Sequence, residues 1–393
     1  MTNTTSAQEF DLAFSYTGNE KKGVLTPLSI PDYKEVKSRK VTSNQAAISF
    51  SITVSGTPVD KLEISIKDSK GPILKELLPS SYNVTGTHEW QWDGYDLKGV
   101  LDSKRLKASA IQVELAATKG QKTKKAVVNL KAKPAEADWV DILINQTTQK
   151  INIELRTNIK NGKAKGVGEL PPQEVQDQPS YKLFSASDPR KKRHIRFKSQ
   201  VDLRSMVFSG LKRYWSRSIS VTNSQLYAVD LTAVHSEKQS MDDIKISYNT
   251  NNAWQRSSNP GSVRGIVSLF GNFVPERIVY NVGWLEDRGR WFYQRPVKAD
   301  LSFKETSAHE IGHEILSAYG GETYSYGHKG SSTVVTQTVK TVANGGEAYP
   351  QQGDIDLMKY YDGRPSRNFF NQVIASEQDV KSLVWLARLK FND

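Results

Sequence analysis

Short segments that alternate apolar and polar residues follow one another between residues 41 and 134, and this pattern restricts the fold more than any other feature. Alternation with a period of two places successive side chains on opposite faces of a β-strand. Turn residues separate the segments at short intervals, as in a small antiparallel sandwich. We therefore predict an all-β sandwich over 39–134, after an N-terminal arm at 1–38. The clearest segments are AISFSITVSG, KLEISIKD, HEWQWDG, ASAIQVELAAT and KKAVVNLKA.

Residues 86–115 of this region carry a more specific motif, GTHEWQWDGYDLKGVLDSKRLKASAIQVEL. Trp92 can anchor a core while Asp93 and Gly94 make a turn. The run resembles Ig-like β-sandwich modules of the flagellar-hook-cap type, which read W-x-W-D-G-x-D-x-x-G before a final strand. The resemblance implies a module that positions other domains and does no chemistry itself. The matching residues are Trp90, Trp92, Asp93, Gly94, Asp96 and Gly99.

The second half of the chain changes to a mixed pattern. Residues 135–180 are predicted to form a β-hairpin and a linker rich in Gly, Pro and polar residues. Helical periodicity over 200–217 predicts a helix packed on the core, with strands following at 226–237 and 277–295. We expect the second large unit to begin between about 135 and 180 and to run to the end of the chain.

Composition excludes several classes of protein. The chain has no cysteine, so any zinc site must use nitrogen and oxygen ligands. No run approaches ~18 apolar residues, which excludes a membrane span, and the N-terminus lacks the pattern of a secretory signal peptide. A formal net charge of +12 would draw the chain to anionic surfaces, such as a bacterial cell wall. No nucleic-acid-binding motif accompanies the basic residues, so nucleic acid is not an expected partner.

The sequence TSAHEIGHEILSAYGG at 306–321 contains an H-E-x-x-H motif. His309 and His313, at positions i and i+4 of a predicted helix, lie on one face and can bind one Zn²⁺. Glu310 is then placed to activate water instead of binding the metal. Ser302 and Glu305 are predicted to form a capping box at the start of this helix, and Gly320 and Gly321 to end it.

A catalytic zinc site requires a third protein ligand, since three protein ligands leave one position for water. The metzincin extension of the motif fails, because Tyr319 stands where its third histidine would be. The candidates downstream are His328, Glu347, Asp354 and Asp356. His328 has a second possible role, as a catalytic hydrogen-bond donor to the oxyanion that forms when water attacks a peptide carbonyl.

The blocks HEIGHEILSAYGG, YSYGHKGSS and GDIDLMKYYDG together resemble the metallopeptidase toxin domain of VgrG C-terminal extensions and related type VI secretion effectors. The resemblance covers roughly 181–393 and implies an α+β zincin-like metallopeptidase domain there. In that family a glutamate of a G-E-I-D-L-M block is the third ligand. The matching residue here is Asp354, with Asp356 and Glu347 as alternatives because aspartate has a shorter reach.

The sequence thus predicts a multidomain protein: an all-β Ig-like sandwich followed by an α+β zincin-like metallopeptidase domain. The expected function is zinc-dependent hydrolysis of peptide bonds by an antibacterial effector, secreted without a signal peptide and acting in the periplasm of target bacteria. Its expected substrates are peptidoglycan stem peptides or periplasmic proteins. Its expected partners are a cognate immunity protein and a component of the secretion spike. The alternative hypothesis is a non-catalytic β-rich adaptor or adhesin whose HExxH helix is incidental.

Overall fold

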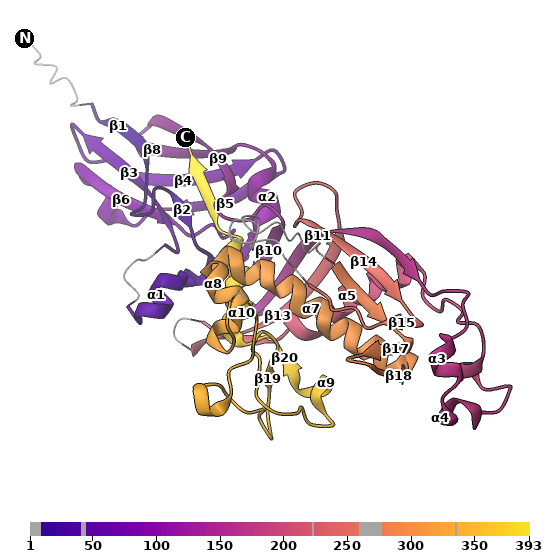
Figure 1. Cartoon of the computed structure of the whole chain (residues 1–393). Helices are drawn as coiled ribbons and strands as arrows, with labels where there is room; N and C mark the ends of the chain where they lie inside the picture. Colours follow the sequence, from indigo (N-terminus) through magenta and orange to yellow (C-terminus); the bar gives the residue numbers. More distant parts are fainter. Residues whose placement is uncertain (1–8, 41–44, 222–223, 259–276, 335) are drawn as a thin grey trace, which may run out of the picture. The chain divides into compact units, whose positions relative to one another are not determined.

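A computed structural model describes residues 9–40, 45–221, 224–258, 277–334 and 336–393 of the chain (Figure 1). The chain divides into two compact units. The first unit comprises 1–153, 219–229 and 383–393, and the second comprises 154–218 and 230–382. No described helix has both the length and the apolar character needed to cross a membrane.

The first unit contains two β-sheets whose strands follow the alternation in the sequence. In the smaller sheet, β3 pairs antiparallel with both β1 and β6, and Phe50 of β3 stacks against rings of both neighbours. In the larger sheet the order is β2-β21-β9-β8-β4-β5. The strands are β1 (Asp11–Gly18), β2 (Val24–Leu25), β3 (Ile48–Ser55), β4 (Lys61–Asp68), β5 (Gly71–Leu77), β6 (Gly86–Trp92), β8 (Ile111–Lys119), β9 (Lys122–Pro134) and β21 (Leu389–Asn392).

The second unit is built around parallel strands. β14 (Asp243–Asn249) lies between β11 (Lys150–Lys165) and β16 (Arg277–Asn281), parallel to both. The helices α5 (Gln200–Trp215) and α7 (Pro296–Gly320) contact each other, and they contact β14 and β16 respectively. Figure 1 shows these two helices side by side along the strands. The sheet and the two helices therefore enclose a core. The H-E-x-x-H motif lies on α7, one of these two helices.

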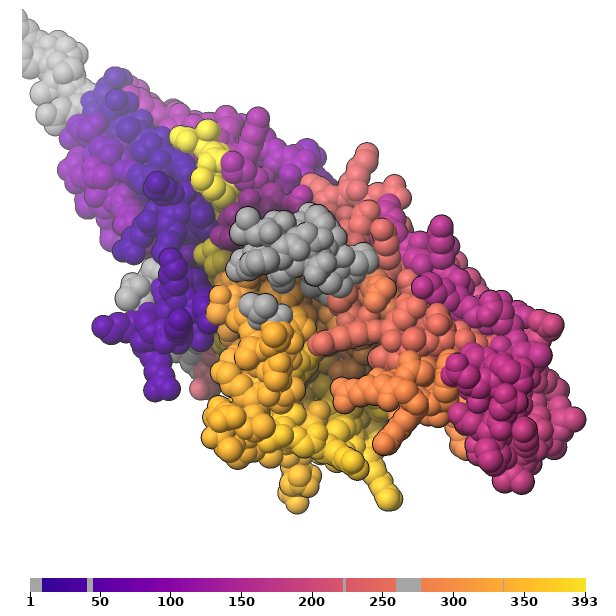
Figure 2. All heavy atoms as spheres, viewed as in Figure 1, coloured from indigo at the N-terminus to yellow at the C-terminus, as the bar shows by residue number. Residues whose placement is uncertain are grey.

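A hairpin and two short helices extend this unit. The hairpin is β17 (Gly283–Asp287) and β18 (Arg290–Gln294), and β15 (Asn252–Ala253) pairs with β17. A small hydrophobic cluster of Val175, Tyr181 and Trp284 joins the hairpin to α3 (Gln173–Gln176) and α4 (Pro179–Lys182). The residues around α3 and α4 form the projecting magenta lobe of Figure 2.

Short elements complete the two units. β7 (Val100–Asp102) pairs with β10 (Val140–Asn145), β13 (Leu226–His235) lies beside β11 and β12 (Ser218–Ser220), and β19 (Ile355–Asp356) pairs with β20 (Val373–Ile374). The remaining α-helices within the described residues are α1 (Tyr33–Ser38), α2 (Ser103–Ala108), α8 (Glu322–Tyr326), α9 (Phe369–Gln372) and α10 (Glu377–Leu386).

The predicted fold class, an all-β Ig-like sandwich followed by an α+β zincin-like domain, is wrong. The sheets of the first unit are not assembled from 39–134 alone, because β1 and β2 come from the predicted arm and β21 is the last strand of the chain. The second unit is itself built on strands, and β11 extends through residues that were expected in a linker. Alternation predicts that a segment is a strand, but it does not indicate which distant strand pairs with it.

Candidate metal centre

Helix α7 carries the H-E-x-x-H motif and is longer than predicted. It begins at Pro296, whose fixed φ suits the first turn of a helix, so Ser302 and Glu305 lie inside the helix and form no capping box. The predicted end is confirmed, because the helix stops at Gly320 and Gly321 follows with a φ of 82°. Such a φ is easily adopted only by glycine. Because the helix begins at Pro296, Glu305 lies within it, on the same helical surface as the motif.

Packing against α5 buries the motif. His309 is 8% exposed and His313 is 2% exposed. The Trp215 indole of α5 donates a hydrogen bond to the carbonyl of Ala308 at 3.1 Å. Gly312 lies so close that an added Cβ would stand 2.8 Å from Trp215 Cζ2. The glycine between the two histidines thus permits the helices to approach and hold both imidazoles in the interior.

His328 is brought to the same place by a turn that follows α8. Its side chain is fully buried, and the turn, η6 (His328–Gly330), has left-handed backbone at both His328 (φ 47°) and Lys329 (φ 59°). Residues other than glycine adopt this conformation at a cost of about 1–2 kcal/mol each, so the surrounding contacts must hold the turn in place.

The three imidazoles form a cluster whose possible ligand atoms all lie within 4.8 Å of one another. The Nδ1 atom of each ring has an oxygen partner: Leu357 O for His309 at 2.7 Å, Ser325 Oγ for His313 at 3.1 Å and Ser332 Oγ for His328 at 2.7 Å.

These partners select one tautomer. The Leu357 carbonyl can only accept, so His309 Nδ1 donates. The Ser325 hydroxyl already donates to the His313 carbonyl, and the Ser332 hydroxyl lies near the carbonyls of Tyr326 and Thr333. Both serine hydroxyls can therefore accept a hydrogen bond from the imidazole Nδ1–H. In this arrangement each Nε2 carries a free lone pair, as a metal-binding imidazole requires.

Two further observations fit a bound cation. Among the described residues, the buried Nε2 atoms of His309 and His328 have no hydrogen-bond partner, although buried polar atoms are normally paired. Burial lowers the pKa of His309, lowers that of His313 well below its ordinary value and lowers that of His328 to about 2; nearby His309 and Arg256 add to the effect on His328. The rings are therefore neutral, which is the form that binds a metal. The His309–His313–His328 triad can hold a metal ion.

The structure does not bring the three carboxylates considered as third ligands to this cluster. Asp354, the residue implied by the family resemblance, has a 62% exposed side chain and pairs with Arg217 at 3.3 Å. Glu347 pairs with Lys359, and Asp356 pairs with Lys329. His328, the remaining candidate, is the one that lies with the two motif histidines.

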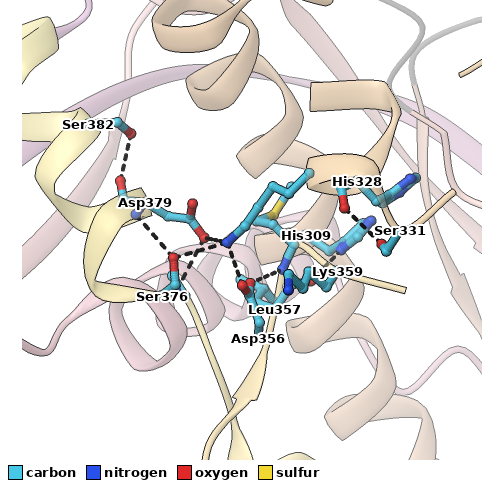
Figure 3. A network of polar contacts seen from close by, with 12 residues as sticks. His309, His328, Ser331, Asp356, Leu357, Lys359, Ser376, Asp379 and Ser382 are labelled. Carbon is cyan, nitrogen blue, oxygen red and sulfur yellow. Dashed lines mark hydrogen bonds and ion pairs between the residues drawn. The ribbon is translucent and has the colours of Figure 1, made fainter. Parts of the chain in front are cut away.

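An ion cluster next to the triad holds the turn of His328 in place (Figure 3). The Lys329 ammonium contacts the Asp356 carboxylate, donates to Asp379 at 2.8 Å and donates to Ser376 at 3.0 Å. Asp379 is fully buried, and the Lys329 side chain is 9% exposed. Asp356 precedes Leu357, whose carbonyl orients His309. One lysine therefore connects the turn of His328 to the strand that positions His309.

A cavity of about 240 Å³ opens beside the triad and is lined by His309, Glu310 and Tyr360. The Tyr360 ring stacks on His328 with centroids 3.6 Å apart, and its hydroxyl accepts a hydrogen bond from Arg256 at 3.1 Å. Burial raises the pKa of Tyr360, so its hydroxyl stays protonated. Tyr360 lies in the block GDIDLMKYYDG, whereas Arg256, 53 positions before His309, carries no sequence signal that points to this site.

Comparison with known proteins adds little to this description. No family model and no curated protein matches the sequence. A β-glucuronidase from Parabacteroides merdae is similar at 10% identity with a TM-score of 0.18, and the match covers 77% of this chain and 32% of that protein. A β-glucuronidase from Ruminococcus gnavus is similar at 8% identity with a TM-score of 0.16, covering 80% of this chain and 35% of that one. This chain thus spans about a third of their length, and likenesses this weak define neither its fold nor its function.

Proposed function

We propose that this chain is a zinc-dependent peptidase. The observation that carries the proposal is the cluster of three buried imidazoles whose Nδ1 atoms have oxygen partners and whose possible ligand atoms lie within 4.8 Å of one another. Three nitrogen ligands with one open position are typical of catalytic zinc. The unpartnered Nε2 atoms weigh against the alternative, an adaptor with an incidental HExxH helix, because nothing else in the described residues satisfies them.

Glu310 supplies the proton transfers in this proposal. Bound zinc would act as a Lewis acid that polarises an amide carbonyl and makes water more acidic. Glu310 lines the cavity next to His309 and can accept a proton from water and deliver it to the leaving amine. Glu310 is not part of the cluster of possible metal ligands, so its carboxylate is available for both transfers.

Tyr360 supplies a hydrogen bond to the substrate. Its hydroxyl accepts from Arg256, so its own proton is available to an oxygen in the cavity. A donor aimed at the carbonyl oxygen as it becomes negative stabilises the transition state by several kcal/mol. Arg256 strengthens this donor by placing a positive charge behind it. The oxyanion role first considered for His328 passes to Tyr360 because His328 belongs to the triad.

The test combines metal content with peptide cleavage. Purified full-length chain should bind about one zinc per molecule and cleave members of a degenerate peptide library detected by mass spectrometry. Glu310→Gln should retain the zinc and lose roughly 10²- to 10⁴-fold in turnover. A protein that takes up no zinc after chelation and repletion would support the adaptor hypothesis instead.

The biological setting is part of the proposal and is supported by the three sequence blocks described above. We propose an antibacterial type VI effector that acts in the periplasm on peptidoglycan stem peptides or periplasmic proteins, with an immunity protein and a spike component as partners. Expression directed to the periplasm of a sensitive bacterium should be toxic, and expression of Glu310→Gln should not. Toxicity that survives this substitution would contradict a hydrolytic effector.

A further inference from the structure

Glu305 is a carboxylic acid of α7 that neither the triad nor the proposed proton transfers use. It lies four residues before His309, which is about one helical turn or ~6 Å along the axis. It lines the same cavity as His309 and Glu310. Its side chain therefore faces the space that a substrate would occupy next to the reacting bond.

Glu305 lacks a cationic partner in the described part of the chain. It accepts one hydrogen bond, from the hydroxyl of the adjacent Thr306 at 3.3 Å, and no cation of the described residues acts on it. Burial raises the pKa of Glu305 to about 7. A carboxylate that is removed from water without a counter-charge is unfavourable, so a positive group entering the cavity would be stabilised there.

The cavity wall combines polar side chains, Arg256 among them, with apolar ones, and its apolar part can hold the stem of a chain with a charged end. Phe303 and Ala299 of α7, together with Trp254, supply apolar wall around Glu305. Arg256 does not neutralise Glu305, because its guanidinium contacts Tyr360 and Gln337. A side chain with an apolar stem and a cationic head can bury the stem and keep the head at a carboxylate.

We propose that Glu305 is a specificity residue that binds an ammonium group of the substrate close to the scissile bond. The group is either the side-chain ammonium of a basic residue or the free amino terminus of a peptide. The proposal rests on the proposed peptidase function, because the bound molecule is a substrate only if the chain cleaves peptides. The binding site itself can be tested without turnover.

Binding is measured first, on full-length chain carrying Glu310→Gln so that nothing is hydrolysed. The probes are N-acetyl-lysine amide, N-acetyl-norleucine amide and norleucine amide, and their affinities are measured by NMR titration. We expect one ammonium probe to bind about 10- to 100-fold more tightly than N-acetyl-norleucine amide, as for a charge-assisted hydrogen bond. Preference for the lysine probe indicates a basic side chain, and preference for norleucine amide indicates a free amino terminus.

Glu305→Gln should abolish this preference. The matched control is Glu314→Gln, the same chemical change on the same helix at a carboxylate that accepts a hydrogen bond from the Asp242 amide and does not line the cavity. The control should leave the preference intact. Equal affinities for all three probes, or a preference that survives Glu305→Gln, would overturn the proposal.

Cleavage then separates binding from proton transfer. In the chain with Glu310 intact, Glu305→Gln should lower kcat/KM about 10- to 100-fold for peptides with the ammonium group and leave neutral analogues unchanged. An equal fall for both would assign Glu305 to proton transfer and overturn the specificity role. If the unsubstituted chain cleaves no peptide, the peptidase function fails, whereas the binding preference still decides the ammonium site by itself.

Discussion

At the scale of single residues, the third member of the triad is where sequence and structure differ most. His309 and His313 could be predicted from spacing alone, because one turn of a helix places residues i and i+4 together. His328 could not, since it reaches the site through a turn with left-handed backbone at two consecutive residues. The family resemblance instead implied Asp354, which is exposed and paired with Arg217.

This difference gives a direct test of the ligand set. His328→Ala should weaken zinc binding by orders of magnitude because it removes a ligand, and the effect should resemble that of His309→Ala. Asp354→Asn should change zinc affinity less than about tenfold, since loss of an outer residue costs roughly 10–100-fold at most. Competition with a chelator of known affinity measures each value. The reverse ranking would restore Asp354 as the ligand.

Glu305 gives the protein a dependence of stability on pH. Burial raises its pKa from 4.5 to about 7, so the folded chain binds a proton more tightly than the unfolded chain. The stabilisation from this proton is complete below pH ~4.5 and is lost as the pH rises through about 7. At pH 8 the ionised side chain should therefore cost up to about 3 kcal/mol of unfolding free energy.

Urea unfolding of the zinc-free chain at pH 5 and pH 8 tests this dependence. The buried histidines of the triad, whose pKa values are lowered, add stability as the pH rises, and this contribution is common to all variants. Raising the pH from 5 to 8 should therefore favour the folded state more in Glu305→Gln than in the unsubstituted chain, by up to about 3 kcal/mol. Glu322→Gln, which changes an exposed glutamate of α8, serves as the control and should show the same change as the unsubstituted chain. An identical change in all three proteins would show that Glu305 is not held in a desolvated environment.

At the scale of elements, the sequence predicted α5 well because its pattern is local. The residues that carry the helical periodicity of 200–217 are all buried: Leu203, Met206, Val207, Gly210, Leu211, Tyr214 and Trp215. The predicted start of α7 was wrong. Ser302 and Glu305 match a capping box, but the helix begins earlier, at Pro296. A capping pattern inside a longer helix is indistinguishable from a true start when only the short motif is considered.

The ion cluster of Lys329 joins three elements: the turn η6, strand β19 and helix α10. Lys329→Met leaves the Asp356 and Asp379 carboxylates without their cation, which should cost about 3–5 kcal/mol of stability. In the fraction that remains folded at low temperature, zinc affinity should fall about 10- to 100-fold, since the turn of His328 is no longer held.

The control is Lys359→Met, which removes a partly exposed pair with Glu347 and should cost about 0–1 kcal/mol. Thermal unfolding measures stability, and chelator competition below the unfolding transition measures affinity. Wild-type zinc affinity in folded Lys329→Met would mean that the ion cluster stabilises the protein without positioning the triad.

At the scale of the whole molecule, pairings between distant segments decide the fold, and alternation does not reveal them. β21 lies more than 250 residues after β9 and still pairs with it in register, Leu389 opposite Pro134. β11 contains the alternating run expected in a hairpin, yet its later half pairs parallel with β14, more than 80 residues away. Such pairings depend on the complementarity of whole sheets, so the motif could be located from the sequence but its scaffold could not.

The family resemblance placed the whole metallopeptidase domain at roughly 181–393, which implies that a fragment beginning near residue 175 contains the complete catalytic unit, and the structure leads to the opposite expectation. Residues 158–165 of β11 pair with β14 over Asn158↔Asp243 to Lys165↔Asn249, so a start at 175 removes one neighbour of a central parallel strand. Parallel strands need neighbours and cover on both faces, and the buried side chains of Ile246 and Tyr248 would lose part of their cover.

We expect the 175–393 fragment to lack a cooperative thermal transition and to bind zinc far more weakly than the full chain. A fragment from 154 to 393 restores β11 and should recover both properties. A 175–393 fragment with full zinc affinity would contradict this expectation, and so would failure of both fragments, because the first unit would then be required as well.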